Sequence, residues 1–191
     1  MNFPFGEIAG LISFGAYVLY IISIVKGQTK PSRSTWWILT LVGFLIFMSS
    51  YSIGARENIW IQLVYTLGPL AIAILSLNPK FGYGVGFSLL DKICFFSALI
   101  FGLIWFVFNA PLVAFLGSII VDFIGIIPTI KKAYIDPKEE DKLAWILEFL
   151  ASIFNALGIT LWFVSVDKSW IYALYLLFIN GLITGLLFKI Y

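Results

Sequence analysis

Histidine is absent from the 191-residue sequence, and Cys94 is its only cysteine. These absences exclude a disulfide within the chain and metal sites built from histidine or from several thiolates. They also exclude histidine as a general acid or base. Cys94 lies in a long apolar run, where an unpaired cysteine usually serves as a small packing residue. We therefore expect no metal and no other cofactor, and an enzyme is the least favoured class of function.

Charged residues are scarce as well. Only 12% of the residues are charged and 61% are hydrophobic, whereas a typical soluble domain has about 25% charged residues. So few charges cannot cover the surface of a water-soluble fold, and the excess apolar surface needs lipid around it. The net charge of +2 is too small to suggest a nucleic-acid partner. We expect an all-α integral membrane protein embedded in the lipid bilayer of the cell membrane.

Long apolar runs divide the chain into candidate membrane-spanning helices. A span needs about 20 residues to cross the hydrocarbon core, and each run here is bounded by charged residues, glycine or proline. The runs predict seven transmembrane helices, at 5–25, 36–52, 59–77, 93–108, 112–130, 143–164 and 170–188. The first run lacks the basic segment and the cleavage site of a signal peptide, so we expect it to remain as a helix.

The stretch 93–130 has two interpretations, as one long helix or as two helices with a break. The segment 109–111 (Asn-Ala-Pro) favours a break, because proline removes a backbone donor and clashes with the preceding turn. Lys92 precedes the stretch, and Lys131 and Lys132 follow it. Basic residues prefer the cytoplasmic face, so both flanks should lie on one side of the membrane. That requires an even number of crossings, and we predict two helices.

The basic residues also predict the orientation of the helices. Cytoplasmic loops carry an excess of lysine and arginine. With seven spans and an external N-terminus, only Arg56 and Lys168 of the 12 basic residues fall outside. The other basic residues fall on the cytoplasmic side: Lys26, Lys30, Arg33, Lys80, Lys92, Lys131, Lys132, Lys138, Lys142 and Lys189. We therefore predict an external N-terminus and a cytoplasmic C-terminus.

Short sequence matches recur in the two ends of the chain, in the same order and at a slowly drifting offset. The matched pairs are Trp37-Ile38-Leu39 with Trp145-Ile146-Leu147 at an offset of 108, then Trp60-Ile61 with Trp170-Ile171 and Tyr65 with Tyr175 at an offset of 110. Insertions in loops produce such a drift. Chance recurrence is the alternative, because tryptophan and tyrosine favour membrane interfaces.

The matches predict two three-helix repeats, residues 1–77 and 112–191. A linker and a fourth helix, residues 78–111, join them. Since each repeat has an odd number of helices and one helix separates them, both repeats run in the same direction through the membrane. Parallel repeats related by an axis along the membrane normal occur in transporters.

With this layout of three, one and three helices, the chain resembles the SWEET and PQ-loop transporter superfamily, and the vitamin transporters that import nicotinamide riboside. The segment 125–132 (Gly-Ile-Ile-Pro-Thr-Ile-Lys-Lys) is similar to the proline-glutamine turn of the PQ-loop family, with Thr129 in place of glutamine. The matching positions of the first repeat, Ile22 and Ser23, lack the motif. The resemblance implies transport by alternating access, with Pro128 as a hinge. A static kink at Pro128 is an equal alternative.

Two carboxylates fall within the predicted spans. Asp122 lies near the centre of the fifth span, and Glu148 lies about one turn inside the sixth. A charge at mid-bilayer costs on the order of 2.5–3.5 kcal/mol, so such residues usually face a bundle interior or a wet cavity. The alternatives are a packing role for Asp122 and an ion pair between Glu148 and Lys142.

Further polar residues share these spans. Glu148, Ser152 and Asn155 are spaced i, i+4 and i+7, which places them on one face of a helix. This face either lines a pore or makes hydrogen bonds between helices. Asn180 is similar to a binding asparagine in the seventh helix of sugar facilitators, but its counterpart in the first repeat is Leu70. The positions that match the polar face in the first repeat are Thr40, Phe44 and Phe47. We therefore predict an asymmetric site, with polar groups from the second repeat and an apolar and aromatic wall from the first.

These features favour a transporter of a small polar solute, working as a facilitator or as a proton-coupled carrier. The predicted solute-binding residues are Asp122, Glu148, Ser152, Asn155 and Asn180. We expect Asp122 to line a central cavity with Asn155 and Asn180 and to exchange a proton, because burial disfavours its charged form. The alternative is a membrane-embedded binding or scaffold protein without a transport cycle. The identity of the solute is open, as is the choice between a monomer and a homo-oligomer.

Overall fold

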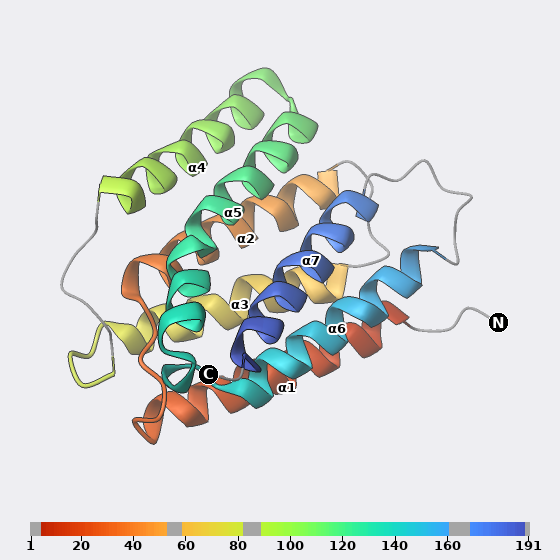
Figure 1. Ribbon diagram of the computed structural model, residues 1–191. Helices are drawn as coiled ribbons and strands as arrows, with labels where there is room; N and C mark the ends of the chain where they lie inside the picture. Colours follow the sequence, from red (N-terminus) through yellow and green to blue (C-terminus); the bar gives the residue numbers. More distant parts are fainter. Residues whose placement is uncertain (1–4, 53–58, 82–88, 161–168, 190–191) are drawn as a thin grey trace.

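The computed structural model describes residues 5–52, 59–81, 89–160 and 169–189. Within these residues the chain forms seven α-helices and one short 3-10 helix, and no strands (Figure 1). The elements are α1 (Phe5–Val25), α2 (Arg33–Ser52), α3 (Ile59–Ser76), α4 (Leu89–Phe108), α5 (Pro111–Ile135), η1 (Pro137–Glu139), α6 (Lys142–Thr160) and α7 (Ser169–Leu187).

The helices follow the apolar runs of the sequence. The predicted break within 93–130 is confirmed, because α4 ends at Phe108 and α5 begins at Pro111. Asn109 between them has a positive φ of 48°, a conformation that asparagine tolerates better than most residues. The largest difference from prediction is in α5, which continues beyond residue 130 to Ile135. The end predicted for the sixth helix, 161–164, lies outside the described residues.

Five of the described helices are long and apolar enough to cross a membrane: Phe5–Val25, Arg33–Ser52, Ile59–Ser76, Pro111–Ile135 and Trp170–Leu187. A shorter apolar stretch, Phe95–Phe108, lies in α4. Helix α6 carries Glu148 within its 19 residues. A helix of 20 residues spans about 30 Å, the thickness of the hydrocarbon core. The protein is therefore embedded in a membrane.

The distribution of polar and apolar side chains over the bundle is that of a protein surrounded by lipid. On α1, one stripe of large apolar side chains is exposed, including Leu11 at 72% and Phe14 at 60%. The opposite stripe is buried and includes the polar residues Ser13, Tyr17 and Tyr20. In a water-soluble bundle this distribution would be reversed. The outer surface therefore fits a hydrocarbon environment, and the polar groups gather inside.

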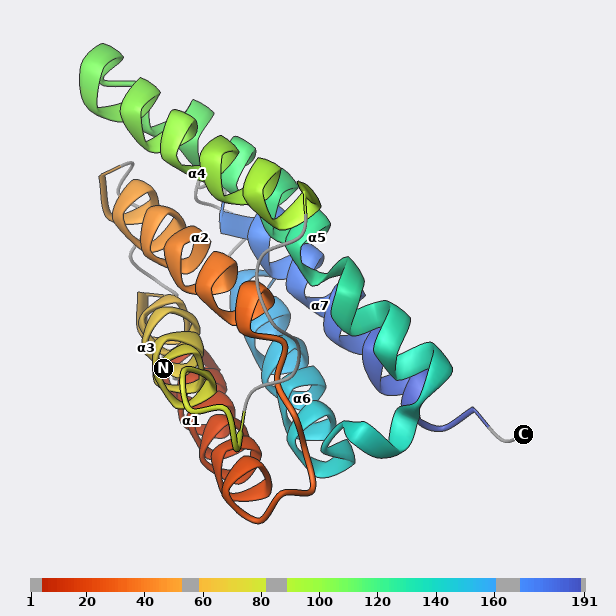
Figure 2. The same ribbon diagram turned by 90° about the vertical axis from the view of Figure 1, so that its left-hand side faces the viewer.

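The helices run roughly along one direction and pack in two groups of three (Figures 1 and 2). In the first group α3 packs against both α1 and α2, and in the second α7 packs against both α5 and α6. The groups meet where α1 packs against α6 and where α2 packs against α5. Helix α4 lies at one edge of the bundle, against α5 and α2, and takes no part in the contact between α1 and α6 (Figure 2).

Several basic segments lie together at one end of the bundle, where Figure 1 also places the C-terminal end of α7. The Lys132 ammonium donates to the backbone carbonyl of Lys30 at 3.0 Å, which joins the end of α5 to the connection between α1 and α2. The Lys189 ammonium lies 3.9 Å from the centre of the Tyr134 ring, which joins the C-terminal end to α5. The N-terminal end of α1 lies at the opposite end (Figure 1). Arg56 and Lys168, predicted on the other side, lie outside the described residues.

Candidate functional site: a polar and aromatic pocket

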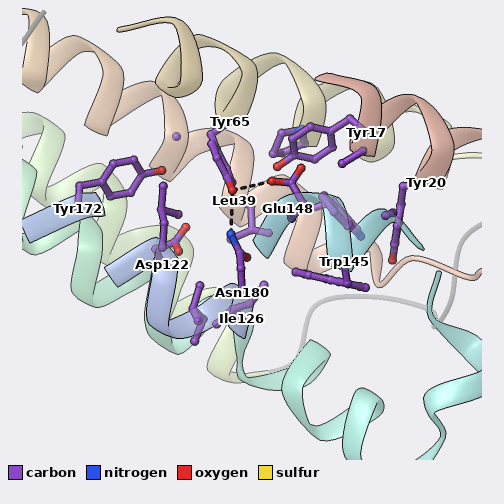
Figure 3. Close-up of a pocket in the computed structure, with 17 residues that line it drawn as sticks. Tyr17, Tyr20, Leu39, Tyr65, Asp122, Ile126, Trp145, Glu148, Tyr172 and Asn180 are labelled. Carbon is purple, nitrogen blue, oxygen red and sulfur yellow. Dashed lines mark hydrogen bonds between the residues drawn. The ribbon is translucent and has the colours of Figure 1, made fainter. Parts of the chain in front are cut away.

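A pocket lies between the two groups of helices and is lined by side chains from every described α-helix except α4 (Figure 3). Its cavity volume is about 60 Å³, within about 640 Å³ of space between atoms that includes open solvent. The lining consists of Ala16, Tyr17, Tyr20, Trp36, Leu39, Gly43, Tyr65, Pro69, Asp122, Ile126, Ala144, Trp145, Glu148, Tyr172, Leu176, Ile179 and Asn180.

Two glycines allow close packing around the pocket. A Cβ atom at Gly68 would lie 2.5 Å from the ring of Tyr17, so the ring of Tyr17 packs against the backbone of α3. A Cβ atom at Gly43 would lie 2.5 Å from the backbone carbonyl oxygen of Tyr65, so α2 and α3 approach closely at this level. The two contacts position Tyr17 and Tyr65 on neighbouring walls of the pocket.

Glu148 is the centre of a hydrogen-bond network that crosses between the two groups of helices. The hydroxyl of Tyr65 donates to one carboxylate oxygen at 2.6 Å, and the hydroxyl of Ser13 lies 3.0 Å from both oxygens. The amide of Asn180 donates to Tyr65 at 2.9 Å (Figure 3) and to Ser152 at 2.8 Å. Glu148 thus receives hydrogen bonds from α1 and α3, although it belongs to α6. The predicted alternative of an ion pair with Lys142 is not the arrangement found.

Asp122 is the second carboxylate of the pocket. It lies near the middle of α5, a helix of 25 residues, and is partly buried. The hydroxyl of Tyr175 on α7 donates a hydrogen bond to it. Its place in the pocket lining agrees with the expectation that a carboxylate at this depth faces the bundle interior.

Aromatic rings form a continuous series along the pocket. Tyr20 contacts Trp36 with ring centres 5.2 Å apart, and Trp36 contacts Tyr17 at 6.3 Å. Tyr17 contacts Tyr65 at 6.0 Å, and Tyr65 contacts Tyr172 at 6.4 Å, both in edge-to-face geometry. These separations are within the range of attractive aromatic pairs. The series gives the pocket rigid walls from α1, α2, α3 and α7.

A buried ion pair lies next to the pocket, at the end of the bundle that carries the basic segments. The Lys132 ammonium is 2.7 Å from the Glu140 carboxylate, whose side chain is 1% exposed. Two residues of the pocket lining, Tyr20 and Trp145, donate to the same carboxylate at 2.9 Å and 3.0 Å. This carboxylate therefore connects α1, α5 and α6.

The sequence-predicted residues occupy different places around the pocket. Asp122, Glu148 and Asn180 line it. Ser152 is fully buried beside it, where it accepts from Asn180 and donates to the Glu148 backbone carbonyl at 2.8 Å. Asn155 is 1% exposed but is not part of the lining, so the expected cavity wall of Asp122, Asn155 and Asn180 is incomplete. Asn155 lies about two turns beyond Glu148, which is the last residue of α6 in the lining.

The remaining predicted positions also lie outside the lining. Pro128 is inside α5, two residues beyond the lining residue Ile126. Phe44, expected in the apolar wall, is 48% exposed and contributes instead to the outer surface between α2 and α4. The wall from α2 is formed by Trp36, Leu39 and Gly43, which lie on another face of the helix. In the lining, the two carboxylates and the amide come from the second group, whereas the first group supplies aromatic rings, three of which carry tyrosine hydroxyls.

Most of the aromatic lining was not predicted from the sequence. Tyr65 and Tyr175 served only as markers of the repeat, although their hydroxyls bond to the two pocket carboxylates. Their positions within spans, away from the interface where tyrosine is usually found, were a signal of this role. Ser13 carried no signal, because small polar residues are frequent at helix contacts.

Within the described part of the chain, no group of three or more carboxylate or cysteine side chains is arranged to hold a metal ion. Comparison of the chain with protein-family models, with curated proteins and with solved structures gave no significant match. The chemistry of the pocket must therefore be inferred from its own residues: two carboxylates, an amide and several aromatic rings.

Proposed function

We propose that the protein is a membrane transporter that moves a small polar solute across the bilayer by alternating access. The observation that carries the proposal is the pocket, where two carboxylates and an amide lie inside a bundle with an apolar outer surface. A carboxylate at this depth costs on the order of 2.5–3.5 kcal/mol and usually marks a path for a solute or an ion. A packed scaffold would need neither the carboxylates nor the cavity.

The packing of the helices supports two parallel repeats, 1–77 and 112–191, of the kind found in the SWEET and PQ-loop superfamily. In each group the third helix packs between the other two. If α1, α2 and α3 correspond to α5, α6 and α7, the contact of α1 with α6 corresponds to that of α5 with α2, and both contacts are present. A rotation about the membrane normal relates such repeats, with the solute site at their interface.

We further propose that all seven helices cross the cell membrane, with the N-terminus outside. The gathering of basic segments at one end of the bundle supports this orientation, because cytoplasmic loops are rich in lysine and arginine (Figure 1). Helices α4 and α6 complete the seven spans. The pocket lies toward the end with the basic segments, since Tyr20 and Trp145 line it and bond to Glu140.

Transport is tested with purified protein in liposomes. The liposomes are incubated with a defined mixture of sugars, amino acids, amines and nucleosides, and their contents are analysed by mass spectrometry. At least one solute should enter faster than into protein-free liposomes. If no component of the mixture enters and the protein remains folded, the scaffold interpretation is the better one.

A matched pair of variants shows whether entry depends on the pocket. Ala16→Phe adds a ring at a lining position that is 1% exposed, whereas Val18→Phe adds a ring at a position on the same helix that is 39% exposed. Ala16→Phe should abolish uptake, and Val18→Phe should leave it unchanged. Size-exclusion chromatography and thermal unfolding establish that both variants are folded.

Coupling to protons is tested at Asp122. Asp122→Asn keeps the shape of the side chain and removes its titration. Uptake driven by an imposed proton gradient should lose its dependence on that gradient in the variant. If the dependence is the same in the variant, or is absent from the unmodified protein, the protein is a facilitator and Asp122 only binds solute.

A further inference from the structure

We infer that the solute of this pocket is an organic cation, an amine or quaternary ammonium group attached to an apolar body. The inference rests on the proposed function, because it names the solute class for the same pocket. Three properties of the lining support it: two carboxylates without a basic residue in the lining, aromatic faces and an amide beside the carboxylates. Each is present in the described residues.

The first property is the charge balance of the pocket. Asp122 and Glu148 are both in the lining, and none of the described lining residues is a lysine or an arginine. The hydrogen bonds described for these carboxylates come from the hydroxyls of Tyr175, Tyr65 and Ser13. Hydroxyl donors orient a carboxylate but carry no positive charge. A bound cation supplies the missing charge, because opposite charges attract strongly where water is excluded.

Glu140 is a buried carboxylate with a structural role, and it has a basic partner. Its side chain is 1% exposed, and it has a lysine counter-ion, Lys132, at 2.7 Å. Asp122 and Glu148 lie deeper along the bundle and lack such a partner among the lining residues. The difference indicates that their counter-charge arrives with the solute.

The second property is the aromatic lining. Tyr17, Tyr20, Trp36, Tyr65 and Tyr172 form the continuous ring series described above, and all of them line the pocket together with Trp145. Aromatic faces attract cations through the ring quadrupole, and cages of such rings bind quaternary ammonium groups. The same faces bind the apolar body of a ligand. A sugar, which needs many directed polar partners, fits this lining less well.

The third property is the position of Asn180. Its amide donates to Ser152 and to Tyr65, and Tyr65 donates to Glu148. Figure 3 shows the two bonds of Tyr65. The amide thereby fixes the hydroxyl that orients the Glu148 carboxylate, so this part of the pocket is arranged before a solute binds. Leu39, Ile126 and Leu176 provide apolar surface elsewhere in the lining. A solute with one charged end and an apolar remainder matches both parts.

Binding to the purified protein in detergent, measured by calorimetry with probes of matched shape, tests the inference. The two pairs are choline with 3,3-dimethylbutan-1-ol, and benzylammonium with benzyl alcohol. Within each pair only the charge changes substantially. The cation of at least one pair should bind at least about tenfold more tightly than its neutral partner. A tenfold difference in affinity corresponds to about 1.4 kcal/mol, and one partly desolvated ion pair contributes more than this.

Variants show which groups make the distinction. Asp122→Asn and Glu148→Gln should each reduce the preference for the cation by tenfold or more, whereas Glu7→Gln, at an exposed position near the start of α1, should not change it. Tyr172→Leu removes an aromatic face and should weaken cation binding about two- to thirtyfold, whereas Tyr172→Phe keeps the face and should not.

The outcomes separate this inference from the proposed function. If neutral and charged probes bind equally, or if neither cation binds while sugars or neutral nucleosides from the mixture do, the cation inference is wrong and transport is unaffected. If the cations bind with the predicted preference but no solute enters liposomes, the site is a cation-binding site and the transport proposal is wrong. If folded Asp122→Asn and Glu148→Gln proteins keep the full preference for the cation over its neutral partner, the carboxylates do not determine that preference.

Discussion

The side chain of Tyr65 joins the two groups of helices through a single hydroxyl. That hydroxyl donates to Glu148 at 2.6 Å and accepts from Asn180 at 2.9 Å. Tyr65→Phe removes it and leaves two buried polar groups with fewer partners. An unsatisfied buried group costs about 1–3 kcal/mol, so the variant should unfold at lower denaturant concentration by about that free energy, measured by chemical unfolding in detergent.

Tyr134→Phe provides the control for this prediction. Tyr134 is 50% exposed near the end of α5, and its ring faces the Lys189 ammonium, a contact that phenylalanine retains. Its removal of a hydroxyl should change stability by less than about 0.5 kcal/mol, as is usual for surface positions. Equal stability of Tyr65→Phe and Tyr134→Phe would mean that the network around Glu148 does not contribute to folding.

At the scale of single residues, the sequence identified the groups whose burial is expensive. Asp122 and Glu148 were predicted to face the interior from the cost of charge in lipid alone, and both line the pocket. The tyrosines were not predicted in this role, because their amphipathic rings suit a membrane interface, a helix contact and a binding site equally well. Which of these applies depends on the neighbours from other helices, and the sequence does not specify them.

The second helix group contains an interior proline that tests the behaviour of a whole element. Pro128 lies inside α5 and cannot donate to the carbonyl of Ile124. Pro128→Ala restores this donor, so the stability of the helix should rise by up to about 3 kcal/mol. If Pro128 is a hinge, the turnover rate in liposomes should fall severalfold while the affinity for solute stays the same.

Pro111→Ala is the matched control, because Pro111 is the first residue of α5, where the backbone N–H has no helical partner in any case. It should change neither turnover nor stability appreciably. A stabilised Pro128→Ala protein with an unchanged turnover rate would identify Pro128 as a static kink.

The connection between α5 and α6 depends on one buried ion pair. Removal of one partner of such a pair leaves a buried charge and costs about 3–5 kcal/mol when both groups are inaccessible. Lys132 is 14% exposed, so water reduces this cost. Glu140→Ala should therefore lower the free energy of unfolding by about 2–3 kcal/mol. Glu139→Ala, at the preceding residue, keeps the backbone carbonyl that Lys132 contacts at 3.4 Å and should have little effect.

A double substitution separates the charge from the packing. Lys132→Met combined with Glu140→Ala removes both charges, so it should recover part of the stability lost in Glu140→Ala. A double variant less stable than Glu140→Ala would show that Lys132 stabilises the protein through its contacts with the Lys30 and Glu139 backbone carbonyls rather than through the charge of Glu140.

At the scale of elements, apolar run length predicted where helices lie better than where they end. The ends of α1 matched the prediction, because a proline precedes its apolar run in the sequence and Lys26 follows it. Helix α5 continued five residues past the prediction, through Lys131 and Lys132, because helical hydrogen bonding continues after the apolar run stops. Hydropathy reports contact with lipid, whereas a helix end depends on backbone partners.

For the whole molecule, the sequence predicted a membrane-embedded bundle and the order of its helices, but not which helices contact one another. Charge and hydropathy predict which apolar runs cross the membrane, but they do not state which helices touch. The packing of α3 between α1 and α2, and of α7 between α5 and α6, depends on shape, as at Gly43 against Tyr65. The pocket arises from that packing, which explains why its carboxylates could be predicted and its full lining could not.

The orientation of the whole bundle is tested by labelling single cysteines on intact cells with an impermeant maleimide. In a Cys94→Ser background, Gln28→Cys, Asn109→Cys and Lys138→Cys each place one thiol at an exposed position in a connection between helices. Three helices, α2, α3 and α4, separate residue 28 from residue 109, and α5 separates residue 109 from residue 138. Asn109→Cys should be labelled on intact cells, and the other two only after permeabilisation, because basic residues lie on their side.

Each alternative topology gives its own labelling pattern. If Gln28→Cys and Lys138→Cys but not Asn109→Cys are labelled on intact cells, the bundle has the opposite orientation in the membrane. If Gln28→Cys and Asn109→Cys are labelled on the same side, an even number of α2, α3 and α4 cross the membrane, and α4, whose described apolar stretch is only Phe95–Phe108, is the helix to exclude. If Asn109→Cys and Lys138→Cys share a side, α5 does not cross, and Asp122 would not lie within the bilayer. The expected pattern requires an odd number of crossings between residues 28 and 109 and one crossing between residues 109 and 138, which is the pattern that two parallel repeats on either side of α4 need.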